Sequence, residues 1–287
     1  MIDLRRARDF VYAHGTLWER ALFAYLFQDA EVERLYRCLL CYKNPDGGYG
    51  HALEHDVRCP DSHPLALEFL LGTLVRLDIP VGSLLDGAAV WVEQARQPDG
   101  SLANPPAVLE YPHAPWWDGG GQSAPDSIVG NLERLGCATA ALRQTTAAWA
   151  REHLTLETIR ATTWLFMAYH AYDYFSSVAA SDIPDHEARW QATIATIVAC
   201  AERAGPKQYF EIFRFAPTPD TPMGRALPDV LRTRYLDYLE ASQEDDGGWH
   251  DEHGLPQWRA YTTIVVLHGL RNYGRSIGAA PRAGVSA

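Results

Sequence analysis

A short Asp-Gly turn recurs along the chain, and its spacing constrains the fold more than any other feature. The copies are NPDGGYG at 44–50, QPDGS at 97–101 and QEDDGGWH at 243–250, and each follows an amphipathic helical pattern. Their aspartates, at positions 46, 99 and 246, are 53 and 147 residues apart, and 147 is three times 49. The repeating unit is therefore about 50 residues long, enough for two helices and their loops.

Helical periodicity fills the chain between these turns, since apolar residues recur at positions i, i+3, i+4 and i+7. The segments with this pattern are 19–27, 31–42, 65–77, 84–95, 158–175, 189–202, 229–243 and 259–274. Strand alternation bounded by hairpin signals is nearly absent. Because 287 residues hold a little under six such units, we expect an all-α fold, a single (α/α)6 toroid of about six helical hairpins that spans 1–287 as one domain.

Each turn has residues suited to reversing the chain after a helix. Aspartate accepts backbone N–H groups in the turn, and the glycines that follow allow the positive φ of a sharp reversal. The aromatic residue after the glycines, Tyr49 or Trp249, is placed to pack back over the preceding helix end. We therefore predict that Asp46 and its counterparts are structural.

Composition excludes several kinds of partner. The net charge is −11, from 36 acidic and 25 basic residues without a Lys/Arg run, which argues against nucleic acid or an anionic membrane surface. No stretch approaches 18 uninterrupted apolar residues, and the N-terminus has no apolar signal core, so we expect a cytoplasmic protein with no membrane span. The five cysteines form no regular framework and are expected to be reduced thiols. A homo-oligomer is compatible with this composition.

The last turn belongs to a longer motif. Its residues are Arg234, Tyr238, Leu239, Gln243, Gly247 and Trp249. This pattern resembles the QW repeat of squalene and oxidosqualene cyclases. A weaker copy keeps Arg34, Leu39, Gly47 and Tyr49 but has Cys38 for the aromatic residue and Lys43 for the glutamine. The chain thus resembles the terpenoid cyclase and protein prenyltransferase superfamily, and more narrowly its small single-toroid bacterial prenyltransferase-like members.

The chain departs from the catalytic motifs of that superfamily. It has neither the DxDD sequence that protonates alkenes nor the DDxxD sequence that binds magnesium, and Asp245 and Asp246 belong to the turn. Asp56 and Cys59 have a different spacing from the zinc ligands of protein prenyltransferases. No GxGxxG or Walker A loop is present, so we expect no cofactor. The resemblance therefore implies a fold and a substrate class without fixing the reaction.

The segment after the first turn, HALEHDVRCPDSH at 51–63, concentrates groups that can exchange protons. The candidate catalytic residues are Glu54, Asp56, Asp61, His51 and His55. At the rim of an apolar pocket, two or three carboxyl groups can have their pKa values pushed apart, so that one stays protonated as a general acid. Structural alternatives are a helix cap at Asp61 and an ion-pair network around Arg58.

A metal site is a further alternative for two histidine groups. His51 and His55 are four residues apart with carboxylates nearby, and His250, Asp251, Glu252 and His253 follow the last turn. The order of residues does not match HExxH, and the glycines before His51 disfavour a helix there. We therefore expect no metal.

Aromatic residues supply candidate walls for the substrate site. Trp116 and Trp117 lie in a Pro/Gly-rich loop, where an adjacent tryptophan pair indicates a lid over a cavity. The full set of predicted substrate-binding residues is Trp116, Trp117, Tyr111, Trp249, Trp258 and Arg58.

These patterns predict cofactor-independent acid–base catalysis, namely cyclisation, isomerisation or dehydration, on a small and largely apolar molecule. A terpenoid substrate is implied only by the resemblance. The carboxylates and the tryptophans also fit a carbohydrate-active (α/α)6 enzyme. A third interpretation is a non-catalytic protein that binds a small molecule.

Overall fold

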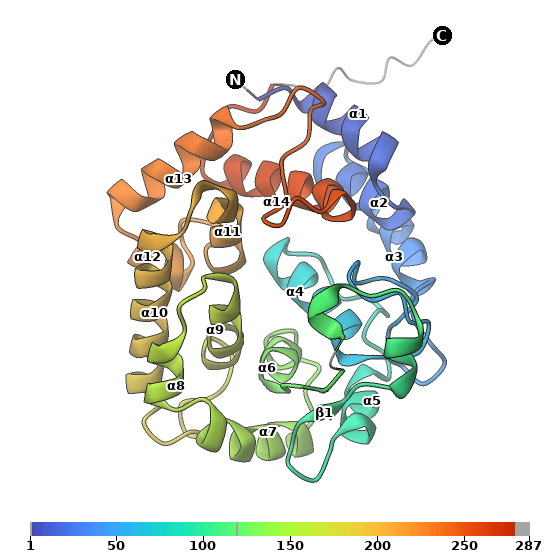
Figure 1. The fold of residues 1–287 in the computed structure, drawn as a ribbon, viewed down its shortest axis with the longest axis vertical. Coiled ribbons are helices and arrows are strands. Elements are labelled where there is room, and N and C mark those ends of the chain that lie inside the picture. The colour runs from blue at the N-terminus through green and yellow to red at the C-terminus, as the bar shows by residue number, and fades with distance from the viewer. Residues whose placement is uncertain (1, 119, 279–287) are drawn as a thin grey trace. The chain divides into compact units, whose positions relative to one another are not determined.

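Helices dominate the computed structural model, which describes residues 2–118 and 120–278 (Figure 1). Fourteen α-helices and several short 3-10 turns lie in these ranges. The single sheet among the described residues has two strands of two residues each, β1 (Leu102–Ala103) and β2 (Gln122–Ser123), paired antiparallel. The chain is therefore mostly helical, as the periodicity predicts. None of the described helices has the length and apolar character needed to cross a membrane.

The chain divides into two compact units, with boundaries inside α3 and α10. Unit 1 comprises residues 2–38 and 201–278, and unit 2 comprises residues 39–200. Helices of unit 1 are α1 (Leu4–His14), α2 (Leu17–Phe27), α3 (Val32–Leu40), α11 (Ile212–Phe215), α12 (Pro222–Ala226), α13 (Asp229–Ala241) and α14 (Arg259–Asn272). Those of unit 2 are α4 (Pro64–Arg76), α5 (Ala88–Ala95), α6 (Asp126–Arg134), α7 (Ala140–His153), α8 (Leu156–Ala161), α9 (Tyr169–Phe175) and α10 (His186–Arg203).

Unit 1 is organised around α14. Every residue from Ala260 to Leu270 is buried, so this helix has no solvent face, and α1, α2, α11 and α13 pack against it. The two ends of the described chain also meet here. Ile2 pairs with Ile277 in a parallel bridge, and the Gly278 amide donates to the Ile2 carbonyl over 3.1 Å. Unit 1 is thus built from the first and last parts of the sequence together.

Unit 2 has α4, α6 and α9 side by side, with α6 packed against both neighbours (Figure 1). The approach of α6 to α9 is close because Gly130 has no side chain, and a Cβ there would lie 2.5 Å from the Asp173 carbonyl oxygen. On the other side α7 packs against α5 and α6. Apolar residues from α7, α8, α9 and α10 form the main cluster of this region. The three helices α4, α6 and α9 carry the polar groups described below.

The predicted turn is present in all three copies. In each, the Oδ1 atom of Asp46, Asp99 or Asp246 accepts the amide two residues later over 2.9 to 3.0 Å. The glycine after each aspartate has φ between 87° and 95°. Each glycine also touches another part of the fold: Gly47 the backbone of Gly87, Gly100 the Trp149 side chain, and Gly247 the Arg6 carbonyl. The structural role predicted for these aspartates is confirmed.

The last copy shows how the turn joins neighbouring helices. The Gln243 side chain accepts the Asp3 amide (2.8 Å) and donates to the carbonyls of Asp3 (3.0 Å) and Gly247 (2.9 Å). Trp249 is 1% exposed, and its Nε1 donates to the Leu239 carbonyl over 2.8 Å. The turn therefore holds the start of α1 against the end of α13.

Two local expectations are wrong. The continuous helix expected over 158–175 is broken, because α8 ends at Ala161, Thr162 has extended backbone, and a 3-10 turn (Phe166–Ala168) leads into α9. Consecutive β-branched residues, Thr162 and Thr163, are poor helix formers at this break. The cap of α4 is His63, whose Nδ1 accepts the Ala66 amide over 3.3 Å, whereas Asp61 is exposed.

Candidate acid–base site

The segment that follows the first turn is held by the long loop between α5 and α6. Val57 pairs with His113, the Arg58 amide donates to the Pro112 carbonyl (3.0 Å), and the Ala114 amide donates to the Asp56 carbonyl (2.8 Å). These backbone bonds fix residues 56–58 against residues 112–114. Both segments lie in unit 2, beside the start of α4.

The two loop tryptophans have different environments. Trp116 is 52% exposed, and its Nε1 donates to Oδ2 of Asp56 over 3.2 Å. Trp117 packs into a small apolar cluster with Val57, Cys59 and Val108. Trp117 thus anchors the loop, and Trp116 reaches one of the predicted catalytic carboxylates.

Glu68, in the second turn of α4, links α4 to α6 and α9. Its Oε1 accepts a hydrogen bond from the Ser127 hydroxyl, and its Oε2 accepts one from the Tyr169 hydroxyl over 3.0 Å. Neither hydroxyl carries a charge, so these two hydrogen bonds do not neutralise a negative charge on the Glu68 carboxylate.

His170 of α9 forms an ion pair with a buried aspartate of α6. Its Nδ1 donates to Oδ1 of Asp126 over 2.8 Å, and Asp126 is 1% exposed. Burial disfavours the charged imidazole, but the Asp126 carboxylate outweighs it and, with Glu68 and Asp173, raises the pKa of His170 to about 9. His170 therefore carries a positive charge at neutral pH. The Tyr169 ring stacks on its imidazole at 4.1 Å.

Asp173 extends this group of charges along α9. Its Oδ2 accepts a hydrogen bond from Nδ2 of Asn131 over 3.0 Å, in the tightly packed region between α6 and α9. Asn131 is 1% exposed, and its Oδ1 has no hydrogen-bond partner. A buried acceptor without a donor costs free energy, so this oxygen marks a place where a donor group would be stabilised.

Glu54, in the loop before α4, interacts electrostatically with Glu68. Its Oε2 accepts the Asp56 amide over 2.9 Å. Burial, followed by the nearby Asp56 carboxylate, raises the pKa of Glu54 well above its usual value, and Glu68 adds to this effect. The Glu54 carboxyl is therefore protonated at pH values where an ordinary glutamate is ionised. We call Glu54, Asp56, Glu68, Asp126, His170 and Asp173 the carboxylate–histidine cluster.

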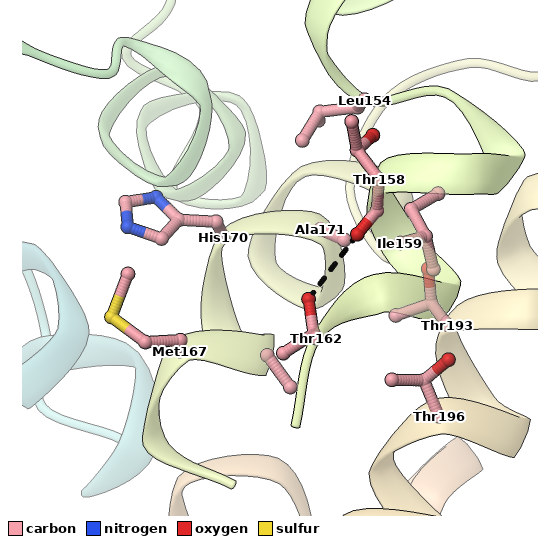
Figure 2. Close-up of a pocket in the computed structure, with 10 residues that line it drawn as sticks. Leu154, Thr158, Ile159, Thr162, Met167, His170, Ala171, Thr193 and Thr196 are labelled. Carbon is pink, nitrogen blue, oxygen red and sulfur yellow. Dashed lines mark hydrogen bonds between the residues drawn. The ribbon is translucent and has the colours of Figure 1, made fainter. Parts of the chain in front are cut away.

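A small cavity of about 60 Å³ lies on the other side of α9, between α8 and α10 (Figure 2). Its walls include four threonines together with Leu154, Ile159, Met167, Ala168, His170 and Ala171. The hydroxyls of Thr158, Thr162 and Thr193 donate to backbone carbonyls. The methyl groups of these threonines therefore help to make the cavity largely apolar. The imidazole of His170 points away from the threonines (Figure 2).

The other predicted catalytic residues have different surroundings. His51 is exposed, has φ of 58°, and its Nε2 lies 2.9 Å from Oδ1 of Asn44, so its bond is to the repeat turn. The carbonyl of Asp61 lies against Gly50, beside the same turn. The His55 ring lies 6.3 Å from that of Phe69 on α4. Only Glu54 and Asp56 of the five enter the carboxylate–histidine cluster.

The remaining predicted substrate-binding residues are spread over both units. Arg58 and Tyr111 are exposed in unit 2. In unit 1, Trp249 is buried and Trp258 lies 6.2 Å from the Tyr261 ring. Their contact with a substrate stays a prediction.

The residues that sequence reasoning missed are Glu68, Asp126, Ser127, Asn131, His170 and Asp173. A signal for some of them was present. Glu68 is the only charged residue in the first ten positions of α4, and His170 and Asp173 lie one turn apart in an aromatic-rich helix. Burying a polar residue of an otherwise apolar helix costs free energy unless the residue has a polar partner. Such a residue in the sequence therefore indicates a buried polar partner.

Metal ligation and known families complete the description of the site. Within residues 2–118 and 120–278, no group of three or more His, Cys, Asp or Glu side chains is arranged to hold a metal ion. Comparison of the chain with protein-family models, curated proteins and solved structures found no match.

Proposed function

We propose that the carboxylate–histidine cluster is an acid–base site that acts on a small, largely apolar molecule, with the Glu54 carboxyl as proton donor. The observation that carries this proposal is the environment of Glu54. Its half-buried position and then the nearby carboxylates of Asp56 and Glu68 favour its protonated form. A carboxylic acid with a raised pKa can protonate an alkene or an alcohol, the first step of an isomerisation, cyclisation or dehydration.

The neighbouring groups have complementary roles in this proposal. The Asp56 carboxylate, held by the Trp116 indole, accepts a proton at the end of the reaction. The carboxylates of Glu68 and Asp126 stabilise positive charge that develops on the substrate, because fixed charges need little reorganisation. The cavity behind His170 offers an apolar subsite near the cluster.

The architecture and the family belong to the same proposal. We infer a single (α/α)6 toroid related to terpenoid cyclases from the repeat spacing and the QW-like motif. The turn geometry shared by Asp46, Asp99 and Asp246 supports it. The bonds of Gln243 to the start of α1 add support, since they join one repeat to the next.

The test is a comparison of the wild-type protein with Glu54→Gln. Both are incubated with a panel of terpenoid alkenes and alcohols, and products are followed by gas chromatography and mass spectrometry. We expect the variant to lose about 100-fold or more of any conversion, since general acid catalysis contributes on this order. Glu152→Gln, at an exposed position of α7, is the matched control. Equal conversion by wild type and Glu54→Gln would refute the role of Glu54.

A carbohydrate-active enzyme is the second candidate. It is favoured by the exposed indole of Trp116 beside the Asp56 carboxylate, since aromatic faces next to carboxyl pairs suit sugar rings. Release of reducing ends from a panel of oligosaccharides, sensitive to both Glu54→Gln and Trp116→Ala, would establish this function in place of the first.

A further inference from the structure

The cavity between α8, α9 and α10 combines a buried wall with an opening to solvent. Thr158 and Met167, which belong to its wall, are exposed, so the cavity has access to solvent. Its volume is about 60 Å³. The buried residues of the wall are Leu154, Ile159, Ala168, Ala171, Thr193 and Thr196.

The polar groups of this wall are mostly engaged elsewhere. The hydroxyls of Thr158, Thr162 and Thr193 donate to backbone carbonyls over 2.7, 3.4 and 2.9 Å. The imidazole of His170 points away from the threonines (Figure 2). Among the described wall residues, Thr196 supplies the remaining threonine hydroxyl. Because a water molecule inside a protein needs two to four polar partners, this wall holds water poorly.

We propose that this cavity is a binding site for a short hydrocarbon group. Carbon atoms that fill the space gain dispersion contacts with the wall and leave water, and both effects favour binding. An apolar protein cavity of about 150 Å³ holds one benzene molecule, so a space of about 60 Å³ has room for about two or three carbon atoms. The ligand is therefore a small apolar molecule, or the alkyl end of a larger one, of this size.

The cavity and the carboxylate–histidine cluster share α9. Ala171 of this helix lines the cavity, whereas the imidazole of His170 is turned away from it toward Asp126 of α6 (Figure 2). Binding of a hydrocarbon group does not require the cluster to be catalytic. The assignment of that group as the short apolar end of the substrate rests on the proposed function.

The experiment is NMR spectroscopy of the full chain, isotopically labelled at the threonine methyl groups, under xenon gas. Xenon is an apolar probe that enters apolar protein cavities. We expect the methyl signals of the four wall threonines to shift with xenon pressure and then to level off, while the signal of the exposed Thr145 of α7 stays unchanged. Nitrogen at the same pressure should leave all five signals in place. Absence of a saturating shift at the wall threonines would overturn the proposal.

A matched pair of variants locates the probe. Ala171→Val adds two carbon atoms to the wall and should remove the xenon response, because the added atoms occupy the proposed site. Ala148→Val, at an exposed position of α7, places the same β-branched residue in a helix and should keep the response. A wild-type response in folded Ala171→Val would show that xenon binds elsewhere. If this variant does not fold, the comparison of xenon with nitrogen in the wild-type protein still decides the matter.

Competition tests the size of the ligand. Cyclopropane should displace xenon, whereas benzene, which needs a cavity of about 150 Å³, should not. Failure of cyclopropane to compete, or competition by benzene, would overturn the assigned ligand class.

The outcomes also separate this inference from the proposed function. Xenon binding combined with conversion that Glu54→Gln leaves unchanged would end the acid–base proposal alone. Conversion that depends on Glu54, without a xenon response, would end the inference about the cavity alone.

Discussion

At the scale of single residues, the surroundings of two histidines of unit 2 shift their pKa values in opposite directions. His170 lies among carboxylates, which raise its pKa to about 9. His63 is fully buried as the cap of α4, and burial lowers its pKa to about 4. The same side chain is thus cationic in one place and neutral in the other over the physiological range, and the stability of the protein should depend on pH at both ends.

The first prediction concerns His170. Its pKa is raised in the folded state, so its contribution to stability is complete below pH 6.5 and is lost as the pH rises through about 9. We expect the free energy of unfolding, measured with urea, to fall by up to about 3 kcal/mol over this range. His170→Gln should remove most of that dependence, and the exposed His14→Gln should retain it. An unchanged pH profile in His170→Gln would contradict the ion pair with Asp126.

The second prediction concerns His63. Its pKa is lowered, so the stability it confers is complete above pH 6.5 and is lost as the pH falls toward about 4. Asparagine is a good helix cap that does not titrate. His63→Asn should therefore reduce the acid loss of unfolding free energy by up to about 3 kcal/mol. Burial likewise lowers the pKa of His268 of α14 to about 4. The His63→Asn variant should therefore still lose the part of its unfolding free energy at acid pH that comes from His268.

At the scale of elements, the glycines of the repeat turns carry both a backbone and a packing requirement. Gly247 has φ of 95°, and a Cβ at this position would lie 2.4 Å from the Arg6 carbonyl oxygen. Gly254 of the same unit has φ of 72° but open space around it. Alanine substitutions at Gly247 and Gly254 therefore separate the free-energy cost of a left-handed backbone from the cost of a clash with Arg6.

The third prediction follows from this comparison. Gly254→Ala should lower the free energy of unfolding by about 1 kcal/mol, the cost of a left-handed alanine. Gly247→Ala should lower it by about 3 kcal/mol or more, because α1 must also move. Thermal unfolding of the two variants measures the difference. Equal losses would show that the contact with Arg6 contributes nothing.

The fourth prediction concerns Gln243, whose side chain makes three backbone hydrogen bonds. Gln243→Ala should lower the free energy of unfolding by about 2 to 4 kcal/mol and speed amide exchange in α1, since the Asp3 amide loses its partner and the Asp3 carbonyl keeps only its bond from the Ala7 amide. The surface variant Gln191→Ala is the control. Unchanged exchange in α1 would mean that other contacts hold this helix.

The elements were also the part of the structure that the sequence predicted best. The periodic segments became helices, and the turn residues adopted the expected conformation, because both depend on local chemistry. The break after α8 and the cap at His63 were missed. Periodicity describes which face is buried and does not register where hydrogen bonding changes, so a continuous apolar pattern concealed the interruption at Thr162.

At the scale of the whole molecule, the candidate site was only half predictable. Glu54 and Asp56 lie in one short segment with many titratable groups, and this local concentration identified them as candidates from the sequence. Glu68, Asp126 and His170 come from three helices far apart in sequence, and only the packing of α4, α6 and α9 brings them together. Spacing rules for single segments cannot detect a site assembled in this way.

The fifth prediction concerns the construction of unit 1 from both ends of the chain. Deletion of residues 2–31 removes α1 and α2, which cover α14. Because α14 is buried on all sides and carries Ile264, Val265, Val266 and Leu267 in one run, the truncated protein should expose it, bind a hydrophobic dye and lose cooperative thermal unfolding. Retention of a sharp transition with no dye binding would show that α14 is stable without these helices.

The pairing of Ile2 with Ile277 joins the first and last described segments of the chain within unit 1. Residues 2 and 277 are already side by side, so a covalent link between these two positions would require little additional ordering. New ends could then be opened in a surface turn such as the one at Gly136, where a left-handed glycine stands in open space. A circular permutant of this kind would keep the carboxylate–histidine cluster in one protein while changing the order in which its helices are synthesised.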